Sequence, residues 1–339
     1  MIDQLQDRKI ALIGGAGFIG HNLALTLKQY GAQVSVIDGL NVNNFLWVHS
    51  NGTVAENRDL YLQILNQRME LLRAAGIQVF IQDARNYFKL SNILNQIKPE
   101  VIVHLAAIAH AKRSNKDPFS TFDHNLRTLE NALDFAQTVV KHFIFFSSSM
   151  VYGNFLTPKV DEEHPLNPIG IYGALKLSGE KLVIAYQQVF GLPYTIIRPS
   201  ALYGPRCISR RVIQIFIENA LRGRKLRIDG DGSEKLDFTY IDDLVDGVCR
   251  AIANPASKNQ VFNMTNGNAR SILEMATTIK EYFPEVETEY VERDGLMPFR
   301  GTMSIDKAVN LLGYAPQNPL EVGMKKYIGW YRNLRIDAP

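Results

Sequence analysis

The sequence predicts an α/β fold in which a doubly wound parallel sheet is joined to a smaller α/β carboxyl-terminal domain. Strand-like and helix-like segments alternate through roughly the first 200 residues, a pattern typical of βαβ units. The strand-like runs are short and apolar, as at residues 10–13, and buried parallel strands have this composition. With 339 residues and an apolar content of 46%, the chain is long enough to bury a large core.

Composition and charge exclude several classes of protein. The net charge of +3 is too small to indicate a nucleic acid or a membrane surface as partner. No apolar run approaches the length of a membrane span, and the polar start is no signal peptide. Cys207 and Cys249 are isolated and the seven histidines are scattered, so no disulfide framework or metal-ligand spacing is indicated. We therefore expect a cytoplasmic protein without a structural metal.

The clearest local signal is a glycine-rich turn between the first strand and the first helix. Gly14, Gly17 and Gly20 are spaced by three residues, and an amphipathic helical pattern follows them. Such a turn leaves backbone N–H groups pointing at an anion bound at the helix N-terminus. Gly14 would allow the tight turn, Gly17 the close approach of a pyrophosphate, and Gly20 the contact of helix on strand. The turn predicts a dinucleotide site, which also includes Phe18 and Ile19.

Residues at the ends of the next strands complete the expected cofactor site. Asp38 ends the second strand, where a carboxylate would accept the ribose 2′-hydroxyl of NAD and repel the 2′-phosphate of NADP. Asp83, followed by Ala84, ends the third strand and is a candidate acceptor for the adenine amino group; a solvated strand-end acid is nearly as good an interpretation. The fourth strand passes into side chains that would let the backbone approach the dinucleotide. The residues expected there are Leu105, Ala106 and Ala107.

Ser148, Tyr172 and Lys176 form the candidate catalytic set. Tyr172 and Lys176 are four apart on one predicted helix and share a face, and Ser148 follows a neighbouring strand. A phenol with the ordinary pKa of about 10 is a poor base at neutral pH, but a nearby ammonium and a positively charged nicotinamide would favour the phenolate. Tyr172 would then remove a sugar hydroxyl proton as hydride leaves the carbon. Ser148 would hold the same oxygen, and Lys176 could also fix the cofactor ribose. Taken alone, the Tyr–Lys spacing also suits a half-buried pair without function.

The rest of the chain carries weaker signals. Residues 41–52 are predicted as loop, and residues 57–75 as a helix with one apolar side. Residues 117–140 are predicted as one long helix, and the helix that carries Tyr172 should run to about residue 190. Residues 239–243 are expected to return to the main sheet, and residues 260–264 are expected to form a late strand.

Several motifs together resemble those of the extended short-chain dehydrogenase/reductases, and within them the nucleotide-sugar epimerases and dehydratases. They lie at residues 14–20, 104–107, 147–153, 172–176 and 198–205, and matches at 230–243 and 311–314 extend the resemblance over nearly the whole chain. The resemblance implies a Rossmann-type domain that holds NAD at 1–199, with 237–265 returning to it. A domain for a nucleoside-diphosphate sugar would then occupy 200–236 and 266–339. The resemblance also implies the catalytic roles above and a homodimer formed through helices 117–140 and 172–190.

Two positions depart from the family pattern, and an insertion extends it. Ala201 stands where 4-epimerases often carry an asparagine, and Leu236 where an arginine often meets the diphosphate. Contacts to the substrate must then come from other residues, and the candidates are Ser148, Ser149, Met150, Arg206, Arg210, Arg211 and Arg300. Solvated surface charge is an equally good interpretation of each single arginine. The helix-bearing insertion at 57–75 resembles one seen in UDP-glucuronate 4-epimerases.

These observations predict NAD-dependent epimerisation at C4 of a UDP-sugar, of the UDP-glucose/galactose or UDP-glucuronate type, through a 4-keto intermediate. Met150 favours this reaction, because dehydratases and decarboxylases of the resembled family commonly carry an acid there and a thioether has no proton to give. A dehydratase or decarboxylase is the main alternative, and a non-catalytic dinucleotide-binding protein is less favoured. The arginines at 206, 210 and 211 suit a carboxylate and so favour a uronate. Cys207 is expected to be a buried filler rather than a mechanistic group.

Overall fold

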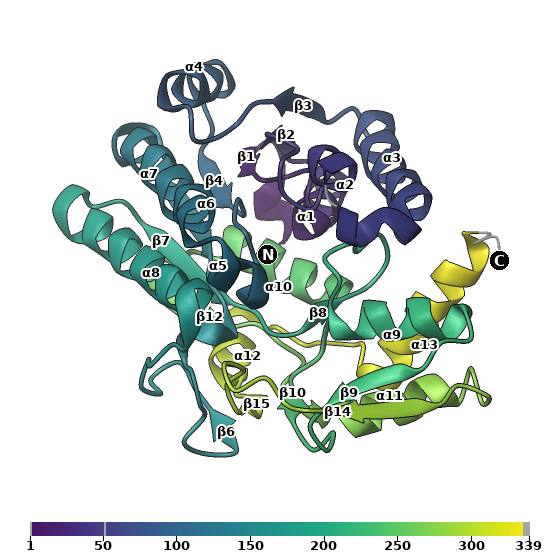
Figure 1. Ribbon diagram of the computed structural model, residues 1–339. Coiled ribbons are helices and arrows are strands. Elements are labelled where there is room, and N and C mark those ends of the chain that lie inside the picture. Colours follow the sequence, from purple (N-terminus) through teal and green to yellow (C-terminus); the bar gives the residue numbers. More distant parts are fainter. Residues whose placement is uncertain (1, 51, 335–339) are drawn as a thin grey trace.

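The computed structural model describes residues 2–50 and 52–334, and its centre is a seven-stranded parallel sheet (Figure 1). The strand order is β12-β7-β5-β4-β1-β2-β3, so the chain reverses its direction across the sheet between β1 and β4. In such sheets ligands bind outside the carboxyl ends of the strands at this reversal. The strands are β1 Lys9–Ile13, β2 Gln33–Asp38, β3 Gln78–Ile81, β4 Val101–His104, β5 His142–Phe146, β7 Tyr194–Arg198 and β12 Gln260–Asn263.

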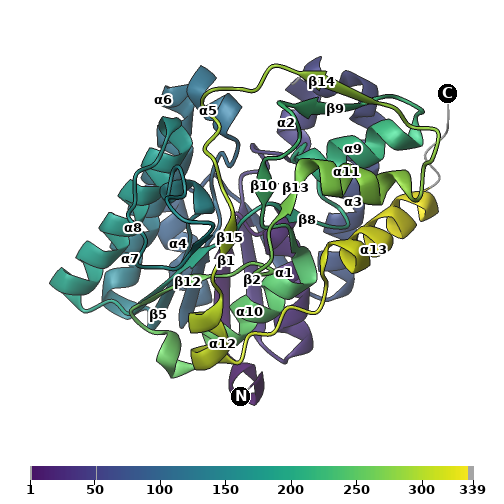
Figure 2. The same ribbon diagram turned by 90° about the horizontal axis from the view of Figure 1, so that it is seen from below.

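Helices cover both faces of this sheet (Figure 2). α1, α3 and α10 lie on one face, and α4, α7 and α8 lie on the other. The helices are α1 Phe18–Gln29, α2 Phe45–Ser50, α3 Arg58–Ala74, α4 Tyr87–Ile97, α5 Ala111–Lys116, α6 Pro118–Phe122, α7 Thr128–Val139, α8 Gly170–Phe190, α9 Val212–Leu221, α10 Ile241–Ala253, α11 Ile272–Lys280, α12 Asp306–Leu312 and α13 Leu320–Asn333. Short 3₁₀ turns lie at Ile2–Leu5, Gly52–Asn57, Ser149–Val151 and Pro255–Ser257, and a π-helical turn lies at Asp123–Arg127. None of the described helices is both long and apolar enough to cross a membrane.

Alternate side chains of each strand enter two separate cores, one on each face of the sheet. In β1, Ile10 and Leu12 belong to one core, and Ala11 and Ile13 belong to the other. Every residue of β4 and of β5 is buried. A strand covered on both faces needs no polar alternation, which explains the continuous apolar runs in the sequence.

The segments that leave the main sheet build a smaller part beside it, where α9, α11 and α13 pack together (Figure 1). Its strands form two-stranded sheets. The pairs are β8 Leu202–Tyr203 with β11 Thr239–Tyr240, β9 Leu226–Asp229 with β14 Thr288–Val291, β10 Lys235–Leu236 with β13 Arg270–Ser271, and β6 Lys159–Val160 with β15 Thr302–Met303. The division of the chain into two domains at the expected boundaries stays a prediction.

Three expected elements differ from the structure. The prediction that residues 239–243 join the main sheet is wrong: β11 pairs with β8 instead, because β12 occupies the edge beside β7. Residues 41–52 are not all loop, since they contain α2, whose Trp47 and Val48 are buried. Residues 117–140 form α6, the π-helical turn and α7 rather than one regular helix. In the π turn, the side-chain oxygen of Asn125 accepts the backbone N–H of Ile108 at 2.8 Å and so holds the segment that follows β4.

Candidate active site

Two adjoining cavities lie at the carboxyl ends of the sheet strands, one of about 540 Å³ and one of about 160 Å³. The glycine-rich turn and the residues that follow β2, β3 and β4 line the smaller cavity. Residues that follow β4, β5 and β7 line the larger one together with carboxyl-terminal segments. The residues that line both cavities mark where they meet, and they are Ile19, Leu105, Ala107, Ala109, Leu202 and Arg211.

The glycine-rich turn has the geometry that a dinucleotide requires. Gly14 has a φ of +83°, and a Cβ there would lie 2.6 Å from the backbone nitrogen of Ala106. A Cβ at Gly20 would lie 2.5 Å from Cα of Gly15, so α1 begins directly against the end of β1. Gly17 lines the smaller cavity and keeps the backbone accessible there. This geometry fits the roles expected of the three glycines.

Asp38 lies at the end of β2 and lines the smaller cavity, as expected. Its carboxylate accepts the backbone N–H of Ala16 at 3.0 Å and that of Leu40 at 2.8 Å. Burial raises the pKa of Asp38, and these two hydrogen bonds oppose the rise. The carboxylate therefore supports the glycine-rich turn from the wall of the smaller cavity. The chemistry of the turn and of this carboxylate fits NAD.

Asp83 also lines the smaller cavity, but its carboxylate already has partners. Arg85 forms an ion pair with it at 2.6 Å, and Asn41 donates to it at 3.1 Å. Although burial acts to raise it, the hydrogen bonds from Arg85 hold the pKa of Asp83 below its ordinary value. Asp83 is therefore neither a freely solvated acid nor an unoccupied acceptor. Ala84 and the expected residues after β4 line the same cavity.

The larger cavity brings Ser148 and Tyr172 together. Tyr172 lies near the start of α8 and is 7% exposed. Burial raises the pKa of the phenol, while the positive charge of Arg211 and the influence of the Ser148 hydroxyl oppose that rise. Both opposing effects favour the phenolate, which is the form a general base needs.

Lys176 lies one helical turn after Tyr172 and also lines the larger cavity. Its ammonium donates to the carbonyl oxygen of Phe146 at 2.6 Å and lies 5.0 Å from the centre of the Phe145 ring. Burial lowers the pKa of Lys176 to about 7, and the carboxylate of Glu180 acts in the opposite direction. Glu180 is one turn further along the same helix face, and sequence reasoning did not single it out although the spacing of four was visible.

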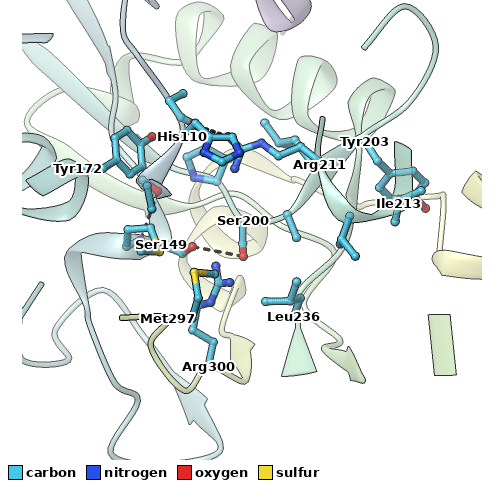
Figure 3. A pocket seen from close by; sticks show the side chains of 18 of the residues that line it. His110, Ser149, Tyr172, Ser200, Tyr203, Arg211, Ile213, Leu236, Met297 and Arg300 are labelled. Atoms are coloured by element: carbon cyan, nitrogen blue, oxygen red, sulfur yellow. Dashed lines mark hydrogen bonds between the residues drawn. The ribbon is translucent and has the colours of Figure 1, made fainter. Parts of the chain in front are cut away.

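Helix α8 lies directly against the turn that carries the next two site residues, Ser149 and Met150. A Cβ on Gly173, which follows Tyr172, would lie 2.7 Å from the Met150 carbonyl oxygen. Ser149 donates to the Ser200 hydroxyl at 3.3 Å, and the Ser148 hydroxyl accepts the Met150 N–H at 3.2 Å. All of these residues except Gly173 line the larger cavity, with Tyr172 and Ser149 on the same side of it (Figure 3).

The four candidate arginines do not all reach the larger cavity. Arg210, Arg211 and Arg300 line it, but Arg206 does not. The Arg206 guanidinium instead donates to His21 at 2.9 Å and to Asn22 at 3.0 Å, on α1. We therefore leave Arg206 out of the substrate contacts. Its φ of +65° turns the side chain toward α1, and a backbone of that kind is difficult to anticipate from sequence.

Arg300 and Arg211 point toward the cavity from different segments (Figure 3). The pKa of Arg300 is lowered to about 10. Burial is the largest cause, the charges of Arg211 and Arg293 act in the same direction, and the charge of Glu234 opposes them. Nε of Arg300 is buried and has no hydrogen-bond partner among the described residues. Ala201 and Leu236 line the same cavity. Arg293, which also lines it, was missed because its segment carries no motif. A cavity with crowded cations and an unused buried donor is suited to an anion.

His110 is a second cavity residue that sequence reasoning missed. It lies between Tyr172 and Arg211 in the close-up view (Figure 3). Its Nδ1 is buried and has no partner within the described chain. Burial lowers the pKa of His110 to about 4, and the charges of Arg211 and Lys112 add to this effect, so the imidazole is neutral at pH 7. A signal was available, since His110 follows the run of small residues after β4.

Cys207 is 1% exposed and lines neither cavity. Its Sγ lies 3.3 Å from the Ser209 hydroxyl, and burial raises the pKa of the thiol. These surroundings fit the expected filler. No cluster of metal-ligating side chains is found among the residues that the structure describes.

Comparison with known proteins agrees with this geometry. The model of the NAD dependent epimerase/dehydratase family matches residues 10–265. The UDP-glucose 4-epimerase of Mycolicibacterium smegmatis is 33% identical over 94% of this chain and 97% of its own length. The UDP-glucuronate 4-epimerase 4 of Arabidopsis thaliana is 27% identical over 95% of this chain and 75% of its own.

Solved structures show the same likeness. The UDP-glucose 4-epimerase of Thermotoga maritima, with UDP-glucose, superposes with a TM-score of 0.83 at 28% identity, covering 96% of this chain and 98% of that one. The UDP-glucuronic acid 4-epimerase of Bacillus cereus, with UDP-glucuronic acid and NAD, has a TM-score of 0.82 at 28% identity, covering 96% and 99%. The chain therefore belongs to the NAD-dependent epimerase/dehydratase family of extended short-chain dehydrogenase/reductases, and it is an NAD-dependent nucleotide-sugar epimerase.

Proposed function

We propose that this protein interconverts the two C4 epimers of a UDP-sugar through a transient 4-keto intermediate. The observation that carries the proposal is that Ser148, Tyr172 and Lys176 all line the larger cavity, which adjoins the NAD cavity. Relatives of both the UDP-glucose and the UDP-glucuronate type support the choice of C4 and of a UDP-sugar.

Each residue of the site has a separate role in the proposed reaction. Tyr172 removes the proton of the C4 hydroxyl and returns it once the ketone has been reduced on the other face, so the proton balance closes within one turnover. Ser148 donates to the same oxygen and holds it in place. Lys176 stabilises the Tyr172 phenolate by its charge. The glycine-rich turn and Asp38 would hold NAD, which would supply the hydride acceptor and donor.

The diphosphate has candidate partners in spite of the leucine at position 236. We assign it to Arg300 and Arg211, with Arg293 nearby. Arg300 has a buried Nε without a partner in the described chain, and the mutual repulsion of the three cations would be relieved by two phosphate charges. His110 would then offer its free Nδ1 to a hydroxyl of the sugar.

The main alternative is a reaction that also transfers a proton at C5 or C3, such as dehydration. Met150 cannot serve such a reaction, but His110 can carry a proton and lines the same cavity. Turnover in D₂O separates the two. A 4-epimerase leaves no deuterium on any carbon and releases neither water nor CO₂. Deuterium at C3 or C5, detected by mass spectrometry and proton NMR, would replace the proposal and assign the second proton transfer to His110.

The sugar itself is best chosen by direct comparison of UDP-glucose with UDP-glucuronate. Arg210 lines the larger cavity and takes no part in the proposed diphosphate contact, so it is available to meet a C6 carboxylate. We therefore propose a uronate as the better substrate. A clear preference for UDP-glucose would discard the uronate and leave the 4-epimerase proposal intact.

We also propose that the protein is a homodimer formed through α6, α7 and α8. Large apolar side chains are exposed on these helices, among them Phe119, Val139 and Val189, and exposed apolar patches mark interfaces. Light scattering of the native protein and of a Phe119→Lys, Val189→Lys variant tests this. A native monomer would remove the assembly from the proposal.

A further inference from the structure

Arg68 is an arginine buried in the middle of the insertion that lengthens the first half of the chain. It lies on α3 and is 1% exposed. Burying a guanidinium is costly unless its hydrogen bonds are satisfied. Burial lowers the pKa of Arg68 to about 10, and the charge of Asp38 acts to raise it, so the group is charged at neutral pH. Its contacts therefore indicate why a charge is kept there.

All of the hydrogen-bond partners recorded for Arg68 are backbone carbonyls. Nε and Nη2 donate to the carbonyl oxygen of Arg206 at 3.0 and 2.5 Å. Nη1 lies 3.5 Å from the carbonyl oxygens of Ala16 and Asn43. The planar guanidinium thus joins three segments that are far apart in the sequence, a geometry that a lysine cannot reproduce.

Two of these segments form the NAD site. Ala16 belongs to the glycine-rich turn, and its N–H donates to Asp38 while its carbonyl faces Arg68. Asn43 follows β2 and lines the cofactor cavity. The turn is therefore held on one side by an anion and on the other by a cation.

The third segment leads to the substrate cavity. Arg206 has a φ of +65°, and its guanidinium is bonded to α1 while its carbonyl is bonded to Arg68. Five residues later, Arg211 lines both cavities and donates to the Ala109 carbonyl at 2.6 Å. Fixing the loop at residue 206 thus restricts where Arg211 can lie.

A second contact of α3 supports the same loop from its other end. Tyr61, two turns before Arg68, donates to Glu218 at 3.0 Å and accepts from Arg210 at 3.3 Å. One face of α3 therefore holds residues 206 and 210 together.

We propose that Arg68 is a positioning residue that joins the cofactor turn to the loop at 205–211, so that NAD retention and the placement of Arg211 depend on one side chain. The NAD part of this proposal does not depend on which sugar is bound. The Arg211 part rests on the proposed diphosphate contact.

The test compares Arg68→Met and Arg68→Lys with the native enzyme, and uses Arg73→Met, an exposed arginine on the same helix, as the matched control. NAD is stripped and its affinity is measured by calorimetry, and the NAD content of freshly purified protein is measured after denaturation. We expect Arg68→Met to weaken NAD binding roughly tenfold or more, Arg68→Lys to be intermediate, and Arg73→Met to match the native protein. UDP is the second probe, and its affinity for NAD-saturated enzyme should fall in the same order.

The thermal midpoint of each variant separates positioning from folding. A folded Arg68→Met that melts earlier but binds NAD with native affinity would show a purely structural role and overturn the proposal. If Arg68→Met does not fold, Arg68→Lys decides, because native NAD affinity in that variant would equally overturn it. Weakened NAD binding with native UDP affinity would overturn the coupling to Arg211. Because both readouts are binding measurements, a failure of the epimerase assignment would not be mistaken for a failure here.

Discussion

The two cavities of this enzyme recognise their ligands by different means. The NAD cavity is lined by many small residues, such as Gly14, Gly17 and Ala106, and its charged side chains include Asp38 and Asp83. The larger cavity is lined by many charged side chains, among them Lys112, Arg211 and Arg300. A binding site made of backbone suits a ligand that is always the same. Long side chains can be substituted individually, and each substitution can change which ligand is bound. The difference teaches that the first region is suited to hold the cofactor, whereas the second combines the proposed catalytic residues with the charged side chains that would select the substrate.

Within the larger cavity, Tyr172 should be the most sensitive position. We expect Tyr172→Phe to lower kcat by roughly 10²-fold or more, the loss typical of a positioned acid–base group. The ring stays in place, so UDP affinity and the thermal midpoint should change little. Steady-state kinetics with calorimetry of UDP binding checks this. Near-native turnover would show that Tyr172 is structural, and the larger cavity would lose its assigned base.

A single cation of the larger cavity should have the next largest effect. Arg300→Met removes a charged donor and should weaken UDP binding roughly 10- to 100-fold. NAD affinity should be unchanged, because Arg300 lines only the larger cavity. Arg58→Met, at an exposed position on α3, is the control. If NAD binding falls together with UDP binding, the two regions are not independent.

The complementary experiment removes one charge, that of Asp38, from the NAD cavity. Asp38→Asn keeps the size of the side chain and loses the carboxylate that would repel a 2′-phosphate. NAD affinity should fall roughly tenfold, and the gap between NAD and NADP should narrow. Calorimetry on stripped enzyme measures both. Equal affinities for the two cofactors in the native protein would remove the role assigned to Asp38.

The last comparison concerns buried histidines, and it begins with the effect of His110 on the pH dependence of stability. His110 has a pKa of about 4 in the folded protein against about 6.5 when unfolded, so the unfolded state binds the extra proton between these values. Its contribution to stability is complete above pH 6.5 and is lost as the pH falls through 4, at most about 3 kcal/mol. The free energy of unfolding of His110→Asn, measured with urea, should depend less steeply on pH across that window than the value for the native protein.

NMR titration sharpens this prediction into a comparison between two histidines. UDP should raise the pKa of His110, because its phosphates offset the charges of Arg211 and Lys112. His142, which burial holds at a pKa of about 3, contacts Thr195 and lines neither cavity, so it should not respond. An equal response of both would show a general change in the fold.

Local sequence patterns predicted part of the fold and of the site, and tertiary packing decided the rest. The strand–turn–helix order, Asp38 and the Tyr172–Lys176 pair are local patterns, so their spacing sufficed. Arg206 shows the limit: it stands among the right residues, but a left-handed backbone turns it toward α1. Arg293 enters the cavity through tertiary packing of a segment without a motif. The failed placement of β11 has the same origin, since only the competition with β12 for one edge decides it.

The glycine that follows Tyr172 has a consequence for how this enzyme can change over time. Because a Cβ at position 173 would lie 2.7 Å from the Met150 carbonyl, even a single methyl group there acts as a spacer that pushes α8 away from the serine turn. An alanine is otherwise well tolerated in helices and would stabilise an isolated one. Position 173 is therefore a place where a substitution that favours folding should be removed by selection for turnover, and a library screened for activity should retain glycine there while one screened for solubility should not.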